Sequence, residues 1–169
     1  ANYNVFDGTD KTANTATITV SGANDNPIVE TDITGTVSES VGTPSDTAQL
    51  SQGGTISFTD VDLSDTHSVS TVTKSSGALG ELSVSLNKDT TGTGGEINWV
   101  YKVDAPTVEY LAEGETKEEI FTFDVEDNKG GSVPCSVKVT IEGSNDFPEL
   151  SIQTGDSAID DTLVESDTG

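Results

Sequence analysis

The residues of this chain that could do chemistry are carboxylates and amides placed where predicted strands end. Asp60 and Asp62 directly follow the alternating run 55–59, and Glu39 follows another such run. Calcium takes six to eight oxygen ligands at roughly 2.3–2.6 Å; one loop rarely supplies them all, whereas several strand ends together can. Further strand-end candidates are Glu113, Glu115, Asp127, Asn145 and Asp146. Any one of them could be an ordinary turn residue, but the whole set favours a metal site.

The charge balance points to the same class of ligand. The 169 residues carry 30 Asp and Glu against 7 Lys and Arg, a formal net charge of -23. Such a chain repels nucleic acids and anionic membrane surfaces and attracts cations. The lysines are dispersed, and no apolar run approaches the roughly 20 residues of a membrane span. We therefore expect no nucleic-acid partner and no membrane insertion. The alternative explanation of the charge is a solubility or salt adaptation.

The sequence does not indicate catalysis. His67 is the only histidine, and Ser64, Asp65 and His67 share one short loop that has no nucleophile motif. A hydrolytic zinc site keeps three protein ligands, often with several histidines. Cys135, the only cysteine, alternates with valines and is expected in the core. We predict that the chain is not an enzyme.

Alternation of polar and apolar residues predicts an all-β fold. Aromatic residues make up only 5% of the chain, and the apolar residues fall in period-two runs. Trp99 and Tyr101 share a strand face with Ile97 and Val103, so we expect them in the core rather than stacked on a sugar. This pattern is typical of an antiparallel β-sandwich, in which Pro134 requires an edge strand or a bulge. Short strands are expected at 28–37, 55–59, 68–73, 82–86, 97–103, 120–125 and 133–141.

A repeated turn divides the chain. Residues 22–27 read Gly-Ala-Asn-Asp-Asn-Pro, and residues 143–148 read Gly-Ser-Asn-Asp-Phe-Pro, a shift of 121 positions from Asn24 to Asn145. An Asn-Asp pair followed by proline is typical of a domain boundary. The preceding alternating runs, 15–20 and 136–141, also correspond. Repetition at this spacing favours tandem β-modules over two ordinary loops.

Three parts follow from the repeat. Residues 1–23 would be the terminal strands of a preceding partial unit, because 5–11 parallels 125–131. Residues 24–146 would be one complete unit. Residues 147–169 would be a linker and the first strand of a following partial unit, because 162–166 echoes 36–40.

Five stretches, in the same order, resemble a VCBS-type, cadherin-like repeat. They are 58–67, 97–101, 111–115, 121–131 and 143–148. Such repeats occur in long secreted bacterial adhesins, many of the calcium-dependent RTX kind. The resemblance implies an Ig/cadherin-like β-sandwich, used as a tandem-repeat module, and a secreted location at the bacterial cell surface. The glycine-rich nonapeptides that bind calcium in RTX proteins are absent from this sequence.

The resemblance also implies calcium at the joints between units. At the upper joint the implied ligands are Asn24, Asp25, Asp60, Asp62 and Asp127. At the lower joint they are Glu39, Glu113, Glu115, Asn145 and Asp146. The chain departs from the cadherin pattern at Gly22 and Gly143, where that pattern has an acidic residue, and in the spacing of 111–115. These departures leave the number of ligands at each joint open.

The expected function is mechanical. The module would extend and space a ligand-binding region away from the cell, with calcium (Ca2+) as its cofactor and neighbouring repeats of the same chain as its partners. Other domains could then bind a cell-surface or matrix ligand. The alternative is a ligand-binding module for carbohydrate or protein, which needs a pocket near 40–54 or 87–95. A related alternative is a scaffold that holds an inserted ligand-binding domain in the same kind of adhesin.

Overall fold

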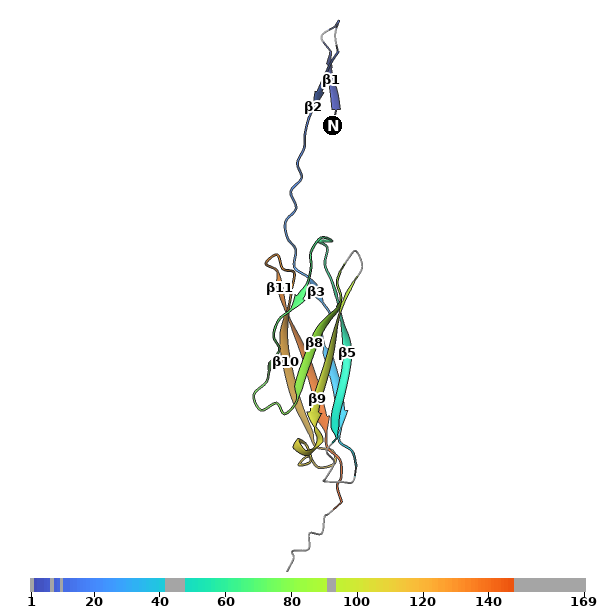
Figure 1. Cartoon of the computed structure of the whole chain (residues 1–169), viewed down its shortest axis with the longest axis vertical. Coiled ribbons are helices and arrows are strands. Elements are labelled where there is room, and N and C mark those ends of the chain that lie inside the picture. Colours follow the sequence, from blue (N-terminus) through green and yellow to red (C-terminus); the bar gives the residue numbers. More distant parts are fainter. Residues whose placement is uncertain (1, 7, 10, 42–47, 91–93, 148–169) are drawn as a thin grey trace, which may run out of the picture.

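The chain is an all-β protein, as the sequence predicts. The computed structural model describes residues 2–6, 8–9, 11–41, 48–90 and 94–147, and its strands form one hairpin and two larger sheets (Figure 1). The 3-10 turn η1 (Ala105–Thr107) is the only helix in these ranges, and it is far too short to cross a membrane. The linker and strand predicted for 147–169 lie outside the described residues, apart from Phe147.

The N-terminal hairpin pairs β1 (Asn2–Phe6) with β2 (Lys11–Thr15) in antiparallel register. Residues 16–27 then run without regular secondary structure to the main body, and Figure 1 shows the hairpin set apart from that body. The alternating run 15–20 forms no strand beyond Thr15, because no strand among the described residues pairs with it. Ile18 and Val20 in this run are 79% and 90% exposed.

The first large sheet has the order β4 (Ile33–Ser38), β11 (Ser132–Glu142), β10 (Thr116–Glu126) and β6 (Ser68–Val69), and β7 (Thr73–Lys74) also pairs with β10. β10 and β11 are antiparallel over their whole length. β4 runs parallel to β11 and pairs only with its second half, residues 137–142. Pro134 therefore lies where β11 is an edge strand, as predicted.

The second large sheet has the order β3 (Ile28–Val29), β5 (Gln49–Thr59), β9 (Gly95–Asp104) and β8 (Glu81–Lys88). The single strand predicted at 28–37 is wrong, because it is split into β3 and β4, which belong to different sheets. Asp32 lies between them with a φ of 62°, and this left-handed residue turns the chain from one sheet to the other. The predicted strand at 68–73 is likewise split into β6 and β7.

Side chains from both sheets meet in one hydrophobic core. Ile97, Trp99, Tyr101 and Val103 all belong to it with exposed fractions of 0%, 3%, 0% and 2%, so the predicted face of this strand is confirmed. Cys135 is also buried as predicted, and burial raises the pKa of its thiol.

The strand register defines two ends of the body. The end where Ile28 faces Thr59 and Phe58 faces Gly95 is called the upper end, and the chain enters there. The end where Ser38 pairs with Glu142 is called the lower end, and the chain leaves there (Figure 1). β11 has 11 residues and so spans roughly 35 Å between the two ends.

Candidate metal centres

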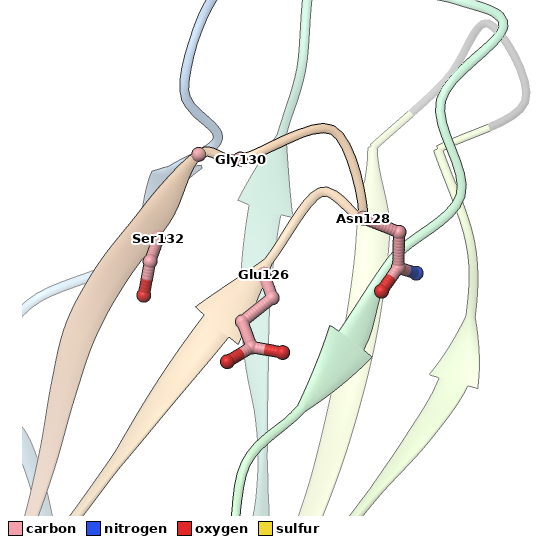
Figure 2. Close-up of a pocket in the computed structure, with 5 residues that line it drawn as sticks. Glu126, Asn128, Gly130 and Ser132 are labelled. Atoms are coloured by element: carbon pink, nitrogen blue, oxygen red, sulfur yellow. The ribbon is translucent and has the colours of Figure 1, made fainter.

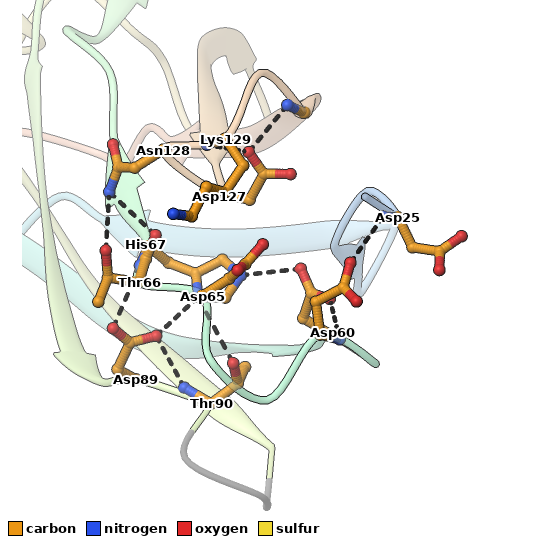
Figure 3. Close-up of polar contacts among 12 residues, drawn as sticks. Asp25, Asp60, Asp65, Thr66, His67, Asp89, Thr90, Asp127, Asn128 and Lys129 are labelled. Atoms are coloured by element: carbon orange, nitrogen blue, oxygen red, sulfur yellow. Dashed lines mark hydrogen bonds and ion pairs between the residues drawn. The ribbon is translucent and has the colours of Figure 1, made fainter. Parts of the chain in front are cut away.

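A compact group of carboxylates lies at the upper end. Asp60 follows β5, Asp65 lies in the loop between β5 and β6, and Asp127 follows β10. Each offers one carboxylate oxygen, and the three oxygens lie within 4.8 Å of one another. These three residues are called the upper cluster (Figure 3). β5 and β10 belong to different sheets, so packing of the two sheets is what brings the cluster together.

The upper cluster is buried and lacks a hydrogen-bond donor at one oxygen. Asp127 is 0% and Asp65 is 8% exposed, and the side chain of Asp60 is fully buried. Oδ2 of Asp65 has no hydrogen-bond partner among the described residues. A buried carboxylate oxygen without a donor destabilises the folded state, and three close carboxylates repel one another. A cation between them would relieve both effects.

Asp127 is held in its charged form. Nδ2 of Asn24 donates a hydrogen bond to its Oδ2 at 2.7 Å, and the N–H groups of Lys129 and Gly131 donate to its Oδ1 at 2.7 and 2.8 Å. The bond from Asn24 lowers the pKa of Asp127; burial opposes this, but the backbone N–H groups add to the lowering and the net shift is downward. Asp127 therefore brings a negative charge to the cluster at neutral pH.

The entering linker is tied to the same loops. The N–H of Asp25 donates to Oδ2 of Asp62 at 2.7 Å, and the N–H of Asp62 donates to Oδ1 of Asp60 at 2.8 Å (Figure 3). All five residues implied for the upper joint therefore lie at the upper end. Asp60 and Asp127 belong to the cluster itself, while Asn24, Asp25 and Asp62 are linked to it through hydrogen bonds.

His67 is enclosed beside the upper cluster. Its Nε2 lies 3.0 Å from Oδ2 of Asp60, its Nδ1 lies 2.7 Å from Oδ1 of Asp89, and its ring packs edge-on against Phe58. Carboxylates only accept hydrogen bonds, so both contacts are satisfied together when both ring nitrogens carry a proton. His67 therefore contacts two aspartates rather than Ser64.

The same contacts set the pKa values of this group. Burial is the largest influence on His67 and lowers its pKa, but the hydrogen bonds and charges of Asp60 and Asp89 outweigh it, so the pKa of His67 is raised overall. For Asp89 burial is again the largest influence, and it raises the pKa of this carboxyl group. The hydrogen bonds from His67 and Thr90 outweigh burial, so the pKa of Asp89 is lowered overall.

A second group of carboxylates lies at the lower end. Glu39 follows β4, Glu109 follows η1, and Asp146 follows β11, and one oxygen of each lies within 4.8 Å of the others. These three residues are called the lower cluster. Glu39 is 6% exposed, and its Oε2 accepts a hydrogen bond from the N–H of Ser144 at 2.9 Å. Its Oε1 and the Oδ1 of Asp146 are buried without a hydrogen-bond partner in the described ranges.

Three residues implied for the lower joint lie outside the lower cluster. Glu113 and Glu115 belong to the exposed turn 112–115, in which Gly114 has a φ of 83°. Oε2 of Glu115 accepts a hydrogen bond from the N–H of Ala112 at 3.0 Å, so it closes its own turn. Asn145 is also exposed. Glu39 and Asp146 are the two predicted residues that the structure brings together here.

Two cluster members are not among the residues that the sequence predicts. Asp65 ends the acidic loop 60–65, and its short distance in sequence from Asp60 could have indicated it as a ligand. Glu109 carries no such signal. It is placed by η1 and the turn after it, where the N–H of Val108 donates to the carbonyl of Ala105 at 2.9 Å and Val108 is 0% exposed.

The chemistry of both clusters suits a hard divalent cation. Each group of three consists of carboxylates, which Ca2+ and Mg2+ prefer, and contains neither sulfur nor imidazole. The buried oxygens of Asp65, Glu39 and Asp146 that lack donors in the described part of the chain fit such an ion. The larger and more variable coordination shell of Ca2+ tolerates ligands from separate loops better than that of Mg2+.

The body also has hollows that the cluster carboxylates do not line. A cavity of about 170 Å³ beside the β10–β11 turn is lined by Glu126, Asn128 and Ser132 together with two glycines (Figure 2). A groove of about 300 Å³ lies where β4 passes β5, and Gln52 and Trp99 help to line it. Trp99 is only 3% exposed, so its ring offers little surface to a ligand.

Comparison with known proteins gives no family. No family model matches the chain, and no curated protein matches it. Among solved structures, the secreted serine protease VesC from Vibrio cholerae aligns with 70% of this chain at 10% identity and a TM-score of 0.37. The chain covers 23% of that protein's length. A likeness this weak carries no information about activity.

Proposed function

We propose that residues 24–146 form an Ig/cadherin-like β-sandwich unit that serves as a calcium-rigidified extender in a secreted bacterial surface adhesin. One observation carries this proposal. Carboxylate clusters lie at both ends of the body, beside the two Asn-Asp turns, and both contain buried oxygens without donors among the described residues. Those ends are where neighbouring units would join, and carboxylate oxygens are the ligands that calcium prefers.

Glu119 provides an internal comparison. It is 0% exposed, but its oxygens accept hydrogen bonds from the N–H groups of Leu79 and Gly80 at 2.6 and 3.1 Å, and from the hydroxyl of Tyr101 at 2.9 Å. The fold can therefore supply donors to a buried carboxylate. The buried oxygens of Asp65, Glu39 and Asp146 lack such donors within the part of the chain described, and all three residues belong to the clusters. This distribution favours a cation over incidental acidic turns.

The N-terminal hairpin supports a repeated unit. It pairs Asn2 with Thr15, and the β10–β11 hairpin pairs Thr122 with Ser136. The shift is 122 − 2 = 120 positions on the first strand and 136 − 15 = 121 on the second, and it holds for every pair of the shorter hairpin. The register is thus the same, with a turn one residue shorter. The last hairpin of a preceding unit would have this register.

The connection after the hairpin supports the same conclusion. Ile18 and Val20 correspond, by the shift of 121, to Val139 and Ile141 of β11, which are both 0% exposed. In this chain Ile18 and Val20 are exposed instead. The sheets of a preceding unit would bury them, as β11 is buried here.

The mechanism follows from charge. Without a cation, the carboxylates of each cluster repel one another, and the hydrogen bonds of Asn24 and Asp25 hold the linker against that repulsion. With calcium, the ion would hold the loops after β5 and β10 together and fix the linker through Asn24 and Asp25. A ligand that binds only the folded state stabilises it by about 2.7 kcal/mol at 100 times its Kd. That stabilisation would replace the bracing that disulfides give many secreted domains.

Thermal unfolding tests the proposal. In the full chain we expect calcium to raise Tm above the value in chelator by about 5–10 °C, the shift that about 2.7 kcal/mol gives a chain of this size. Magnesium should give a smaller rise. Asp65→Asn should reduce the calcium response, whereas Glu113→Gln, on an exposed turn, should keep it. An equal Tm in calcium and chelator would overturn the proposal and leave the net charge of -23 as a solubility or salt adaptation.

A ligand-binding module is the second candidate, and the groove beside β5 is the observation that favours it. Glu30, Asp32 and Gln52 line this groove and could bind the hydroxyl groups of a sugar. Binding of the full chain to a glycan array, lost in Gln52→Ala, would support this candidate. Binding that persists in that variant would place the ligand elsewhere.

A further inference from the structure

A buried line of polar contacts leads from the upper cluster to the turn between β8 and β9. It starts at Oδ2 of Asp60, passes through the ring of His67 and reaches the carboxylate of Asp89 at the end of β8 (Figure 3). The N–H of Thr90 then donates to Oδ1 of Asp89 at 2.8 Å. The side chains of Asp60 and His67 are 0% exposed and Thr90 is 2% exposed, whereas the side chain of Asp89 is 26% exposed, so the line is buried from Asp60 to His67 and reaches solvent at Asp89.

We propose that His67 is a positioning residue that fixes Asp60 for cation binding and couples the upper cluster to the β8–β9 turn at Asp89 and Thr90. This inference rests on the calcium function proposed above. It extends that function to His67 and to Asp89 and Thr90, which follow the edge strand β8. None of these three residues would contact the ion.

The geometry leaves Asp60 little freedom. Its Oδ1 accepts a hydrogen bond from the N–H of Asp62 at 2.8 Å, and its Oδ2 contacts Nε2 of His67 at 3.0 Å. The ring of His67 is held in turn by Phe58, whose ring centroid is 4.9 Å away at an interplanar angle of 61°. Outer-shell partners that orient a metal-binding side chain typically change metal affinity 10–100-fold when they are removed.

The contacts on the far side of the ring explain the coupling. Both the Nδ1 and the N–H of His67 contact Asp89, at 2.7 and 3.1 Å, so the ring and Asp89 are held together. A cation bound to the Asp60 carboxylate would change the hydrogen bond between Asp60 and His67. Hydrogen bonds in a chain polarise one another, so the contact between His67 and Asp89 would change as well. Linkage is reciprocal, so a change at Asp89 must also alter cation affinity at the upper cluster.

Three backbone amides allow the two ends to be read separately in one NMR titration. The N–H of Gly131 donates to Asp127 in the upper cluster, the N–H of Ser144 donates to Glu39 in the lower cluster, and the N–H of Thr90 reports the turn. The full chain is titrated with calcium chloride from a metal-free state. We expect the amide chemical shifts of Thr90 and Gly131 to change together, with the same apparent Kd for calcium.

His67→Phe should separate these signals. We expect calcium affinity at Gly131 to fall about 10–100-fold, affinity at Ser144 to change by less than about twofold, and Thr90 to stop following Gly131. His67→Gln, which keeps a hydrogen-bond donor, should recover part of the affinity. Tyr101→Phe is the control for a general loss of stability, because it removes a buried hydroxyl that contacts Glu119 and neither cluster.

A second variant, Asp89→Asn, changes the line of contacts at the Asp89 end. Asp89→Asn leaves the contact between Asp60 and His67 in place, so Thr90 should stop following Gly131 while affinity at Gly131 falls less than in His67→Phe. Equal losses at Gly131 and Ser144 in His67→Phe would show a purely structural role and overturn the inference. A wild-type chain in which Gly131 does not respond to calcium would instead overturn the proposed function at the upper end.

Discussion

At the scale of single residues, the surroundings of each carboxylate oxygen separate the metal candidates from other acidic residues. Glu113 and Glu115 lie on an exposed turn, where water solvates their charges. Asp65 and Glu39 each have an oxygen that neither water nor a described donor reaches. An exposed carboxylate is stable by itself, whereas a buried one is stable only with a partner. A buried oxygen without a described donor is therefore the property that distinguishes these residues, and sequence spacing alone does not report it.

His67 gives a pH dependence whose sign can be worked out. Its pKa is raised above the ordinary value of 6.5, so the folded state binds the proton more tightly than the unfolded state. The resulting stabilisation is complete below the unfolded pKa and is lost as pH rises through the folded pKa. In chelator, we expect the free energy of unfolding of the wild type to decrease as pH rises above about 6. In His67→Gln the decrease should be smaller, because the contribution of the imidazole is absent.

Urea unfolding at a series of pH values measures this effect. The difference between wild type and His67→Gln isolates it, because other groups such as Cys135 titrate in both proteins. A difference that stays constant with pH above about 6 would show that the imidazole contributes no proton-linked stability.

At the scale of elements, the crossing from β3 to β4 is the feature that the alternating pattern does not reveal. β3 pairs with β5 in one sheet and β4 pairs with β11 in the other, and only Asp32 and its neighbours separate them. The left-handed residue Asp32 moves the chain from one sheet to the other while it continues from the upper towards the lower end, so one run of sequence serves two sheets. Aspartate tolerates this conformation better than most residues that carry a side chain.

Substitution of Asp32 tests that account. Asp32→Gly should keep the stability or raise it by up to about 1 kcal/mol, because glycine adopts a positive φ without strain. Asp32→Val should lower the stability by about 1–2 kcal/mol. Thr34→Val, two residues later in β4 and exposed, is the control and should change stability by less than about 0.5 kcal/mol. If the two valine variants unfold at the same urea concentration, the left-handed turn is not important for the crossing.

At the scale of the whole molecule, the two clusters lie at opposite ends of one rod-like body (Figure 1). The linker that enters the upper end is held by Asn24 and Asp25, and Asp146 lies in the lower cluster at the end where the chain leaves. Cations at both ends would therefore act on the direction of the chain between units rather than on the core. Stiffness along a series of units is what an extender requires.

Asp60→Asn combined with Asp62→Asn should loosen the upper joint and leave the core folded. Spin labels at Ala13→Cys in β2 and Val100→Cys in β9, in a Cys135→Ala background, would report the distance between hairpin and body. We expect calcium to narrow the distance distribution in the parent and to leave it broad in the double variant. Glu115→Gln, which changes a residue of the lower end, should behave like the parent.

The Tm in chelator is the check on the core in this experiment. It should differ little between the double variant and its parent, because removal of two negative charges offsets the weakened contact between Asp60 and His67. Loss of the folded core in the double variant, with calcium still bound normally, would contradict the assignment of these aspartates to the joint.

The all-β fold, the buried face of β9 at Ile97 to Val103 and the two Asn-Asp turns can all be predicted from the sequence, because alternation and turn chemistry are local properties of the chain. The sequence also placed Asp60, Asp127, Glu39 and Asp146 at strand ends. Which of these carboxylates lie close together depends on the folded arrangement of the two sheets. Asp65 and Glu109 join the clusters and Glu113 and Glu115 do not, because convergence depends on how two sheets pack and how each loop turns, and residues far apart in sequence set both.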